Sequence, residues 1–320
     1  MGLVRIVRES LDDLDVSVST GFSWTDKPDI ARQLSEVRLM YDIEKDAKLK
    51  SLDSIMRNKV FKDVVSEIEK GSFMVYYQPK VDIRTGQIVG TEALARWIRN
   101  GEVIQPFRFI PTMERNGFII HLDLYILKRV CEAINEWIEK GYKLVPISVN
   151  ISRNDISGVG HDPRMLAERI IRIIKEYDID PKYIIIEVTE TTEASEQKDL
   201  YDFIRNMSEA GIATSIDDFG TGCSTLSVLR DFPVNEIKID RSFINHEAFS
   251  TQDQIIIKSI IQMARQLNLN VITEGVETEE QARFLLELGC NHAQGYLYDK
   301  PLEQSAFESR LSVGGYDRKI

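Results

Sequence analysis

From residue 73 onward, short apolar runs alternate with longer stretches in which apolar residues recur every three or four positions. The short runs are rich in isoleucine and valine, which predicts strands buried on both faces. The wider spacing predicts helices with one buried side. Strands are expected at 73–77, 88–91, 147–149, 183–186, 212–216, 236–237 and 270–273. Helices are expected around 126–137, 166–177, 195–210, 256–267 and 282–286, and a glycine or proline follows most of them.

Repeated strand–helix units over most of the chain predict an α/β fold, a TIM-type (β/α)8 barrel rather than an open doubly wound sheet. A dinucleotide-binding sheet also lacks its main signal, because no Gly-x-Gly-x-x-Gly follows the first strand. The first 58 residues differ, with strand-like alternation over 16–22 and helical spacing over 30–41. This segment is too short for a core of its own. We therefore expect an α+β N-terminal extension at 1–58 and a barrel domain at 59–316.

Six strand-like runs lead to a carboxylate, an amide or a lysine. These residues are Asn150, Glu187, the pair Asp217-Asp218, Lys238, Glu274 and Gln294. Taken singly, an aspartate at a strand end is most often a helix cap, an asparagine a turn residue and a lysine a solvated charge. These interpretations do not explain why so many strands end this way. Because chemistry in barrels collects where the strands end, we expect the side chains to share one site.

The net charge limits the partners of this chain. Its 320 residues include 40 Lys and Arg against 51 Asp and Glu, a formal charge of −11. General affinity for a nucleic acid polymer or an anionic membrane surface is therefore not expected. An acidic protein that handles a phosphate substrate would need metal cations to reconcile the charges. Glu92, Asn150, Glu187, Asp217 and Asp218 offer only oxygen ligands, which select Mg²⁺ or Mn²⁺ over zinc, and adjacent aspartates can bridge two ions.

Cysteine use and hydropathy indicate the compartment. Three cysteines without CxxC spacing are typical of reduced thiols in a cytosolic protein. No apolar run approaches the roughly 18 residues that a membrane-spanning helix needs, and the first residues do not resemble a signal peptide. We expect a cytoplasmic location without direct membrane insertion, although the chain could be the cytosolic part of a larger, membrane-associated sensor.

The segment Glu92-Ala93-Leu94-Ala95-Arg96-Trp97 resembles the signature of EAL-domain cyclic di-GMP phosphodiesterases. Other motifs of that family occur in the family's order between about Phe73 and Leu302. They are Tyr77-Gln78-Pro79, Ser148-Val149-Asn150, Glu187-Val188-Thr189-Glu190, Asp217-Asp218-Phe219-Gly220-Thr221-Gly222, Ile237-Lys238-Ile239-Asp240, Glu274-Gly275-Val276-Glu277, Gln294-Gly295-Tyr296 and Lys300-Pro301. The resemblance implies a barrel with a modified first strand.

The resemblance also implies two metal ions. Glu92, Asn150, Glu187 and Asp217 would bind one, and Asp217 would bridge to a second that Asp218 also binds. Glu274 and Gln294 would hold the waters of the second ion. Lys238 lies where the family has the residue that orients the attacking water. A lysine beside cations can have a lowered pKa, so the base is either Lys238 or Glu274.

Other positions match residues that bind the substrate or hold a loop. The family's substrate-binding positions correspond to Gln78, Leu94, Arg96, Asp240 and Pro301. Arg96 could instead form a surface ion pair, and Asp240 could equally support Lys238. The family uses acids such as Glu190 and Glu277 to hold the loop that contains Thr221, although both could be plain surface charges. Cys223 and Asp299 depart from the family pattern in this loop and before Lys-Pro.

The resemblance implies an enzyme that hydrolyses cyclic di-GMP to linear pGpG with a water activated by two Mg²⁺ or Mn²⁺ ions, and that Ca²⁺ inhibits. The alternative is a weakly active or inactive cyclic di-GMP receptor or regulatory module. The resemblance also implies a homodimer. Residues 16–21, 39–41 and 45 resemble the end of a degenerate GGDEF domain, but the chain has no Gly-Gly-Asp/Glu-Glu-Phe signature.

Overall fold

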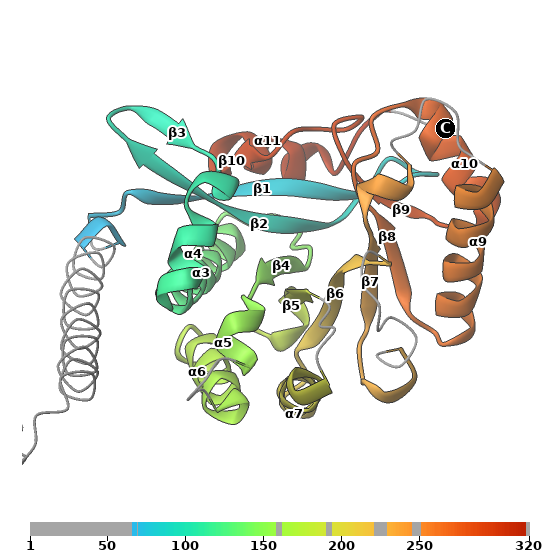
Figure 1. Cartoon of the computed structure of the whole chain (residues 1–320). Coiled ribbons are helices and arrows are strands. Elements are labelled where there is room, and N and C mark those ends of the chain that lie inside the picture. The colour runs from blue at the N-terminus through green and yellow to red at the C-terminus, as the bar shows by residue number, and fades with distance from the viewer. Residues whose placement is uncertain are drawn as a thin grey trace, which may run out of the picture. The chain divides into compact units, whose positions relative to one another are not determined.

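The computed structural model contains a closed α/β barrel (Figure 1). The structure describes residues 66–68, 70–157, 162–189, 194–220, 229–244 and 251–317. The expected N-terminal extension at 1–58, with its resemblance to a GGDEF domain, lies outside these residues. The barrel confirms the predicted fold class.

Of the ten strands in the described part of the chain, eight close the barrel, and each neighbour in the series is hydrogen-bonded to the next. Their order is β1 (Phe73–Asp82), β9 (His292–Gln294), β8 (Asn270–Thr273), β7 (Glu236–Ile239), β6 (Ala213–Phe219), β5 (Ile184–Thr189), β4 (Ile147–Asn150), β2 (Ile88–Arg99) and back to β1. Two short strands, β3 (Glu102–Ile104) and β10 (Leu302–Glu303), extend the sheet beside β2 and β1.

The first strand runs against the others, as the resemblance implied. β1 is antiparallel to β2 and β9, whereas the pairs from β2 through β4 to β9 are parallel. A tight turn between β1 and β2 causes this. Asp82 accepts hydrogen bonds from the backbone of Arg84 at 2.9 Å and Thr85 at 3.0 Å, and Gly86 has a φ of 72°. A positive φ costs glycine little, so the chain can reverse here.

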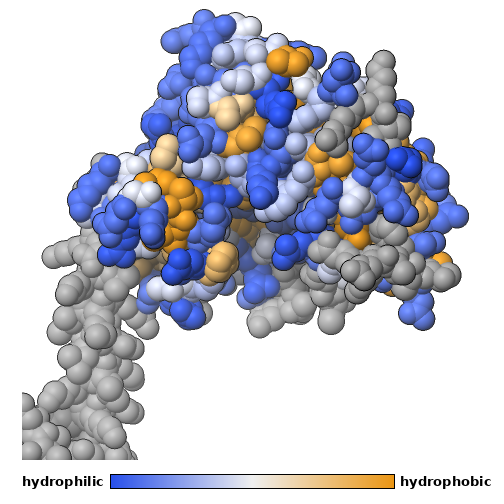
Figure 2. All heavy atoms as spheres, turned by 90° about the horizontal axis from the view of Figure 1, so that it is seen from above, coloured by the Kyte–Doolittle hydropathy of each residue, from blue (hydrophilic) through white to orange (hydrophobic). Residues whose placement is uncertain are grey.

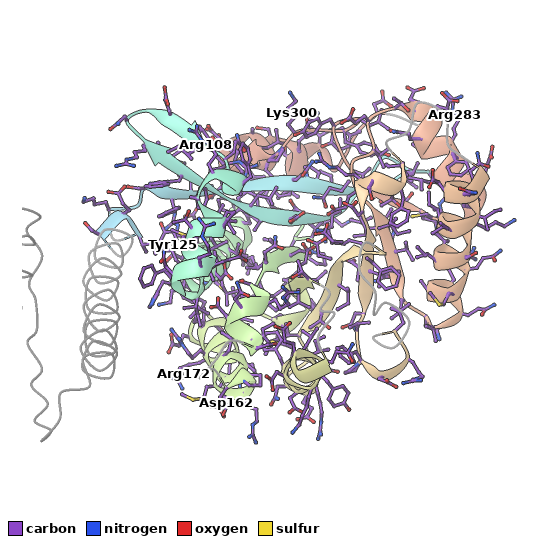
Figure 3. The ribbon with its side chains drawn as sticks, viewed as in Figure 1. Arg108, Tyr125, Asp162, Arg172, Arg283 and Lys300 are labelled. Atoms are coloured by element: carbon purple, nitrogen blue, oxygen red, sulfur yellow. The ribbon has the colours of Figure 1, made fainter. Side chains whose placement is uncertain are left out.

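Helices follow most of the barrel strands and cover the outside. They are α3 (Ile110–Asn116), α4 (Ile119–Glu139), α5 (Arg153–Ser157), α6 (Pro163–Glu176), α7 (Ala194–Glu209), α9 (Thr251–Gln266), α10 (Glu279–Leu288) and α11 (Gln304–Val313), with short 3₁₀ turns η2 (Pro106–Arg108), η3 (Pro181–Tyr183) and η4 (Arg241–Phe243). Every helix expected between residues 126 and 286 is present. Charged side chains such as Arg172 of α6 and Arg283 of α10 lie on the outside (Figure 3).

An aromatic cluster fixes β1 against the helices. The ring centroid of Tyr77 lies 5.2 Å from that of Trp137 in α4 and 5.4 Å from that of Phe307 in α11. Each of these side chains is at most 1% exposed. Buried aromatic residues contribute much of the stability of a core. The cluster therefore holds in place the strand that carries Gln78.

The surface seen from above is mostly hydrophilic, with hydrophobic residues in separate places (Figure 2). Scattered exposed apolar residues such as Phe107 are usual for a folded protein. Within the described part of the chain, no helix has the length and apolar character needed to cross a membrane. Cys131 and Cys290 are free and buried, and Cys223 lies outside the described residues.

Gly295 is required by a close approach of two backbone segments. A Cβ at this position would lie 2.1 Å from the carbonyl oxygen of Val276 and 2.3 Å from its nitrogen. The same segments are joined by hydrogen bonds from Val276 N to Gln294 O at 3.1 Å and from Leu297 N to Val276 O at 2.9 Å. Gly295 directly follows β9, and Val276 lies three residues after β8. A displacement of either backbone segment would therefore move the end of the strand before it.

We expect Gly295→Ala to lower the free energy of unfolding by about 1–3 kcal/mol, the usual cost of overpacking, because backbone atoms cannot turn aside. Urea denaturation followed by tryptophan fluorescence measures this. Gly101→Ala is a suitable control, since a Cβ at Gly101 meets nothing within 4 Å and only its φ of +79° is strained. A loss below about 0.5 kcal/mol in Gly295→Ala would mean that the close approach contributes nothing.

Candidate metal and substrate site

Asp217 and Asp218 lie at an irregularity near the end of β6, not after the strand as the sequence predicted. Neighbouring side chains of a regular strand point to opposite faces. Here the pairing with β7 shifts between Ile216 and Phe219, and Asp218 has a φ of 52°. Such a bulge redirects side chains. Carboxylate oxygens of Asp217, Asp218 and Glu274 consequently lie within 4.8 Å of one another, a group that could hold a metal ion.

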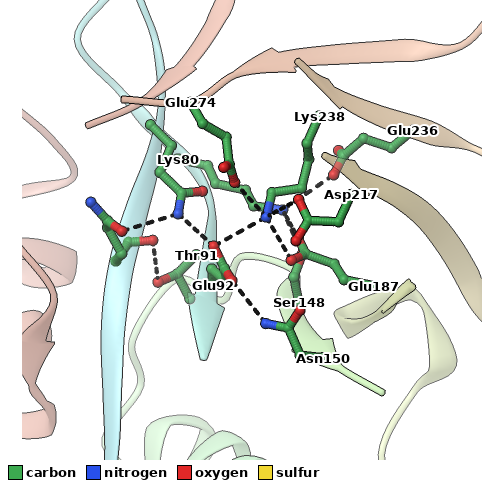
Figure 4. A network of polar contacts seen from close by, with 12 residues as sticks. Lys80, Thr91, Glu92, Ser148, Asn150, Glu187, Asp217, Glu236, Lys238 and Glu274 are labelled. Atoms are coloured by element: carbon green, nitrogen blue, oxygen red, sulfur yellow. Dashed lines mark hydrogen bonds and ion pairs between the residues drawn. The ribbon is translucent and has the colours of Figure 1, made fainter. Parts of the chain in front are cut away.

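The ammonium group of Lys238 lies among four carboxylates (Figure 4). Its Nζ is 2.6 Å from Glu274 Oε1, 2.8 Å from Glu187 Oε2, 3.0 Å from Asp217 Oδ1 and 3.2 Å from Glu92 Oε2. The lysine is 1% exposed. Barrel closure therefore brings together acids that are far apart in the sequence, as expected.

The charges around Lys238 determine its protonation. Burial by itself lowers the pKa of Lys238, but the surrounding carboxylates outweigh burial and hold that pKa well above its ordinary value. A lysine beside bound cations would have a lowered pKa. The pKa of Lys238 is raised instead, because its neighbours in this structure are carboxylates.

The pKa values of Glu187 and Glu274 are shifted in opposite directions. Burial tends to raise the pKa of Glu187, but the ammonium groups of Lys238 and Lys80 outweigh it and bring this pKa to about 2. For Glu274, burial outweighs the attraction of Lys238 and raises the pKa to about 8. The two carboxyls therefore differ in how readily they bind a proton.

Glu92 is held on both of its oxygens. Oε1 accepts a hydrogen bond from Asn150 Nδ2 at 2.8 Å. Oε2 accepts hydrogen bonds from Gln294 Nε2 at 2.6 Å and from Lys238 Nζ at 3.2 Å. Asn150, at the end of β4, and Gln294, at the end of β9, thus converge on Glu92 from different sides. All three partners donate, so Glu92 acts only as an acceptor.

The donor set fits a hard cation. Every candidate ligand offers oxygen, as Mg²⁺ and Mn²⁺ prefer. Among the candidate ligands, two buried oxygens accept no hydrogen bond from any described residue. They are Gln294 Oε1 and Asp217 Oδ1, and the latter is only ion-paired with Lys238. Buried polar atoms rarely lack a partner. Bound ions and their waters would supply these partners.

The residues predicted to bind substrate lie in two groups. Gln78 is beside the acids, because its Oε1 accepts a hydrogen bond from Gln294 Nε2 at 3.1 Å. Leu94 and Arg96 lie further along β2, and Arg96 stacks over the Tyr76 ring at 5.4 Å. Arg96 pairs with no carboxylate among the described residues, which argues against the surface ion pair.

Asp240 and Pro301 lie just outside strands: Asp240 directly follows β7, and Pro301 directly precedes β10. The Oδ1 of Asp240 accepts a hydrogen bond from Ser242 N at 2.9 Å and caps η4, so this aspartate anchors a turn. Pro301 is half-buried and precedes β10, which pairs with β1. Asp299 lies in the same segment. Its carboxylate accepts hydrogen bonds from Arg310 Nε and Tyr316 Oη, both at 2.7 Å.

The predicted loop contacts remain predictions. Glu190 and Thr221 lie outside the described residues. Glu277 is exposed just before α10. Its backbone N–H donates to Gln281 Oε1 at 2.7 Å in the capping of that helix.

Two charged residues inside the barrel, Lys80 and Glu236, are not among the predicted site residues. Lys80 Nζ is 2.7 Å from Glu187 Oε1 and 3.1 Å from Glu236 Oε1. Strand periodicity could have revealed them. Lys80 lies two residues after Gln78, and Glu236 two residues before Lys238, so each shares a face with a site residue.

Known proteins resemble this chain in sequence and structure. The model of the EAL domain family matches residues 61–301. The chain is 35% identical over 241 residues to the bifunctional diguanylate cyclase/cyclic di-GMP phosphodiesterase MucR of Pseudomonas aeruginosa, covering 75% of this chain and 34% of MucR. It is 34% identical over 245 residues to the probable cyclic di-GMP phosphodiesterase PdeB of Escherichia coli, covering 75% of this chain and 45% of PdeB.

The chain therefore spans less than half the length of these two relatives. A solved structure of the PaMucR phosphodiesterase in complex with c-di-GMP matches with a TM-score of 0.70 and 34% identity, covering 78% of this chain and 99% of the other. The family match extends over the strands that carry the acid cluster. By sequence and by fold, the chain belongs to the EAL domain family.

Proposed function

We propose that this barrel hydrolyses cyclic di-GMP to linear pGpG with the help of two divalent metal ions. The observation that carries the proposal is the convergence of Glu92, Glu187, Asp217 and Glu274 around Lys238. The names of MucR and PdeB and the c-di-GMP complex of PaMucR support this choice of substrate. The activity would serve to lower the level of this second messenger in the bacterial cytoplasm.

The two ions would be held by Glu92, Asn150, Glu187, Asp217 and Asp218. Glu274 and Gln294 would hold the waters of the second ion. Bound Mg²⁺ or Mn²⁺ would polarise the phosphodiester and stabilise charge on the attacking and leaving oxygens. Ca²⁺ is larger and binds with more flexible geometry. We expect it to occupy the site and inhibit.

The chain's own residues would bind and orient the substrate. Arg96, held over Tyr76, presents a planar guanidinium suited to a phosphate. Gln78 and Asp240 would contact the guanine bases, as the family resemblance implies. Leu94 and Pro301 would also bind the substrate.

Proton transfer would involve Lys238 or Glu274. Lys238 Nζ and Glu274 Oε1 are 2.6 Å apart, so a proton can pass between them. Cations bound to the carboxylates would remove the attraction that keeps Lys238 protonated. Either group could then accept the proton of the attacking water.

The test is chromatography of products after incubation of the full chain with cyclic di-GMP and Mn²⁺. We expect linear pGpG with Mn²⁺ or Mg²⁺, none with EDTA, and recovery when excess Mn²⁺ follows the EDTA. Ca²⁺ added with Mn²⁺ is expected to reduce product. Binding of cyclic di-GMP without pGpG in any metal would instead indicate a receptor. The proposed homodimer is tested separately by light scattering.

A further inference from the structure

A second buried lysine, Lys80, lies in the barrel beside the acid cluster. Lys80 is 2% exposed and belongs to β1. It lies opposite Gly90 of β2, where a Cβ would come within 3.5 Å of the Lys80 side chain. This is an ordinary van der Waals distance, so the aliphatic part of Lys80 packs directly against the backbone at Gly90. A buried charge is costly unless it is fully paired.

The ammonium group of Lys80 has an acceptor for each of its three protons. Its Nζ donates to Ser148 Oγ at 2.5 Å, to Glu187 Oε1 at 2.7 Å and to Glu236 Oε1 at 3.1 Å (Figure 4). These acceptors lie on β4, β5 and β7. The position of the Lys80 ammonium group is therefore fixed by hydrogen bonds to three other strands.

The two carboxylate oxygens of Glu187 contact different lysines. Its Oε1 faces Lys80 at 2.7 Å, and its Oε2 faces Lys238 at 2.8 Å. Glu187 is 0% exposed. Lys238 also contacts the three other acids of the cluster, so Oε2 is the oxygen directed toward them. Lys80 holds the opposite oxygen and thereby sets the orientation of the carboxylate.

Glu236 balances the charge of this arrangement. Alone, Lys80 would neutralise Glu187 and weaken its attraction for a cation. Glu236 shares the ammonium group at 3.1 Å, so the positive charge is divided between two carboxylates. Hydrogen bonds to a metal ligand from such outer partners commonly tune metal affinity.

We propose that Lys80, supported by Ser148 and Glu236, is a positioning residue that directs Glu187 toward a metal ion. The inference rests on the proposed function only in requiring that the acid cluster binds a divalent ion. Lys80 does not touch substrate. It acts through the carboxylate that it orients.

The main test is the double variant Lys80→Met/Glu236→Met in the full chain. It removes one charge of each sign, and an apolar replacement of a buried ion pair is often tolerated. Mn²⁺ affinity is measured by calorimetry and by electron paramagnetic resonance of free Mn²⁺. We expect a dissociation constant about 10–100 times larger than that of the unchanged chain. Hydrolysis should recover with excess Mn²⁺, because Glu187 itself is kept.

Ser148→Ala is a gentler variant, should the double variant not fold. It removes one hydrogen bond of Lys80 and little volume, and we expect Mn²⁺ affinity to fall about three- to tenfold. Thr214→Val is its control, because it too removes one buried hydroxyl of similar size. Thr214 lies on β6 in register with Ile186 rather than with Glu187, so its side chain faces away from the acids. Its Mn²⁺ affinity should be unchanged.

The outcomes separate this inference from the proposed function. A folded double variant that binds Mn²⁺ as tightly as the unchanged chain, with only its melting temperature lowered, would mean that Lys80 is merely structural. If the unchanged chain binds no Mn²⁺, the metal site is wrong and this inference falls with it. Normal Mn²⁺ binding without pGpG would overturn the proposed hydrolysis alone.

Discussion

Changing Glu92 to glutamine is expected to slow hydrolysis of cyclic di-GMP roughly a thousandfold while the barrel stays folded. Asn150, Gln294 and Lys238 all donate to Glu92. A glutamine has the same shape, but one of its two groups is an NH₂ that would face a donor. The change also removes a charged ligand. Loss of about 4 kcal/mol of stabilisation by the metal corresponds to this factor in rate.

The rate is followed by chromatography of pGpG at saturating Mn²⁺. Glu279→Gln is the matched control, because Glu279 is exposed on α10 and pairs only with Arg283 at 3.2 Å among the described residues. Its rate should equal that of the unchanged chain. Near-normal hydrolysis by Glu92→Gln would show that the charge of Glu92 is not needed and would refute the assigned role of this residue.

The barrel could be predicted because its signals are local. Isoleucine and valine runs in β4 and β5 identify buried strands, and the spacing of apolar residues identifies α4 and α6. The placement of acids near the ends of these strands also follows from sequence order, because parallel strands of a barrel end on one side. The sequence therefore predicts a common site for Asn150, Glu187 and Asp217. Glu92 lies within β2 rather than at its end, and its assignment comes from the motif that resembles the EAL signature.

What the sequence could not predict depends on pairing between distant strands. The bulge at Asp217 and Asp218 is a change of register between β6 and β7, which neither strand reveals alone. Lys80 and Glu236 are 156 positions apart in the sequence and meet only because the barrel closes. The high pKa of Lys238 likewise arises from carboxylates on other strands.

The position of Lys238 implies that its positive charge stabilises the protein when no divalent ion is bound. Four carboxylates lie within 3.2 Å of its Nζ. Like charges at such proximity repel strongly in a buried site. Divalent ions bound between the same carboxylates would provide the same compensation. The ammonium group and the ions should therefore substitute for each other in stabilising the fold.

We accordingly expect Lys238→Met to lower the free energy of unfolding by about 3–5 kcal/mol in EDTA, the usual cost of removing one partner from a buried ion pair. Mn²⁺ should restore much of this loss, about 2.7 kcal/mol at a hundred times its dissociation constant. Urea denaturation with EDTA and with Mn²⁺ measures both values. Should the variant be unfolded in EDTA, the same titration follows its refolding by Mn²⁺. Lys198→Met, at an exposed position of α7, should change stability by less than about 0.5 kcal/mol. A Lys238→Met protein as stable in EDTA as the unchanged chain would contradict this, because the four acids would then need no cation to stay together.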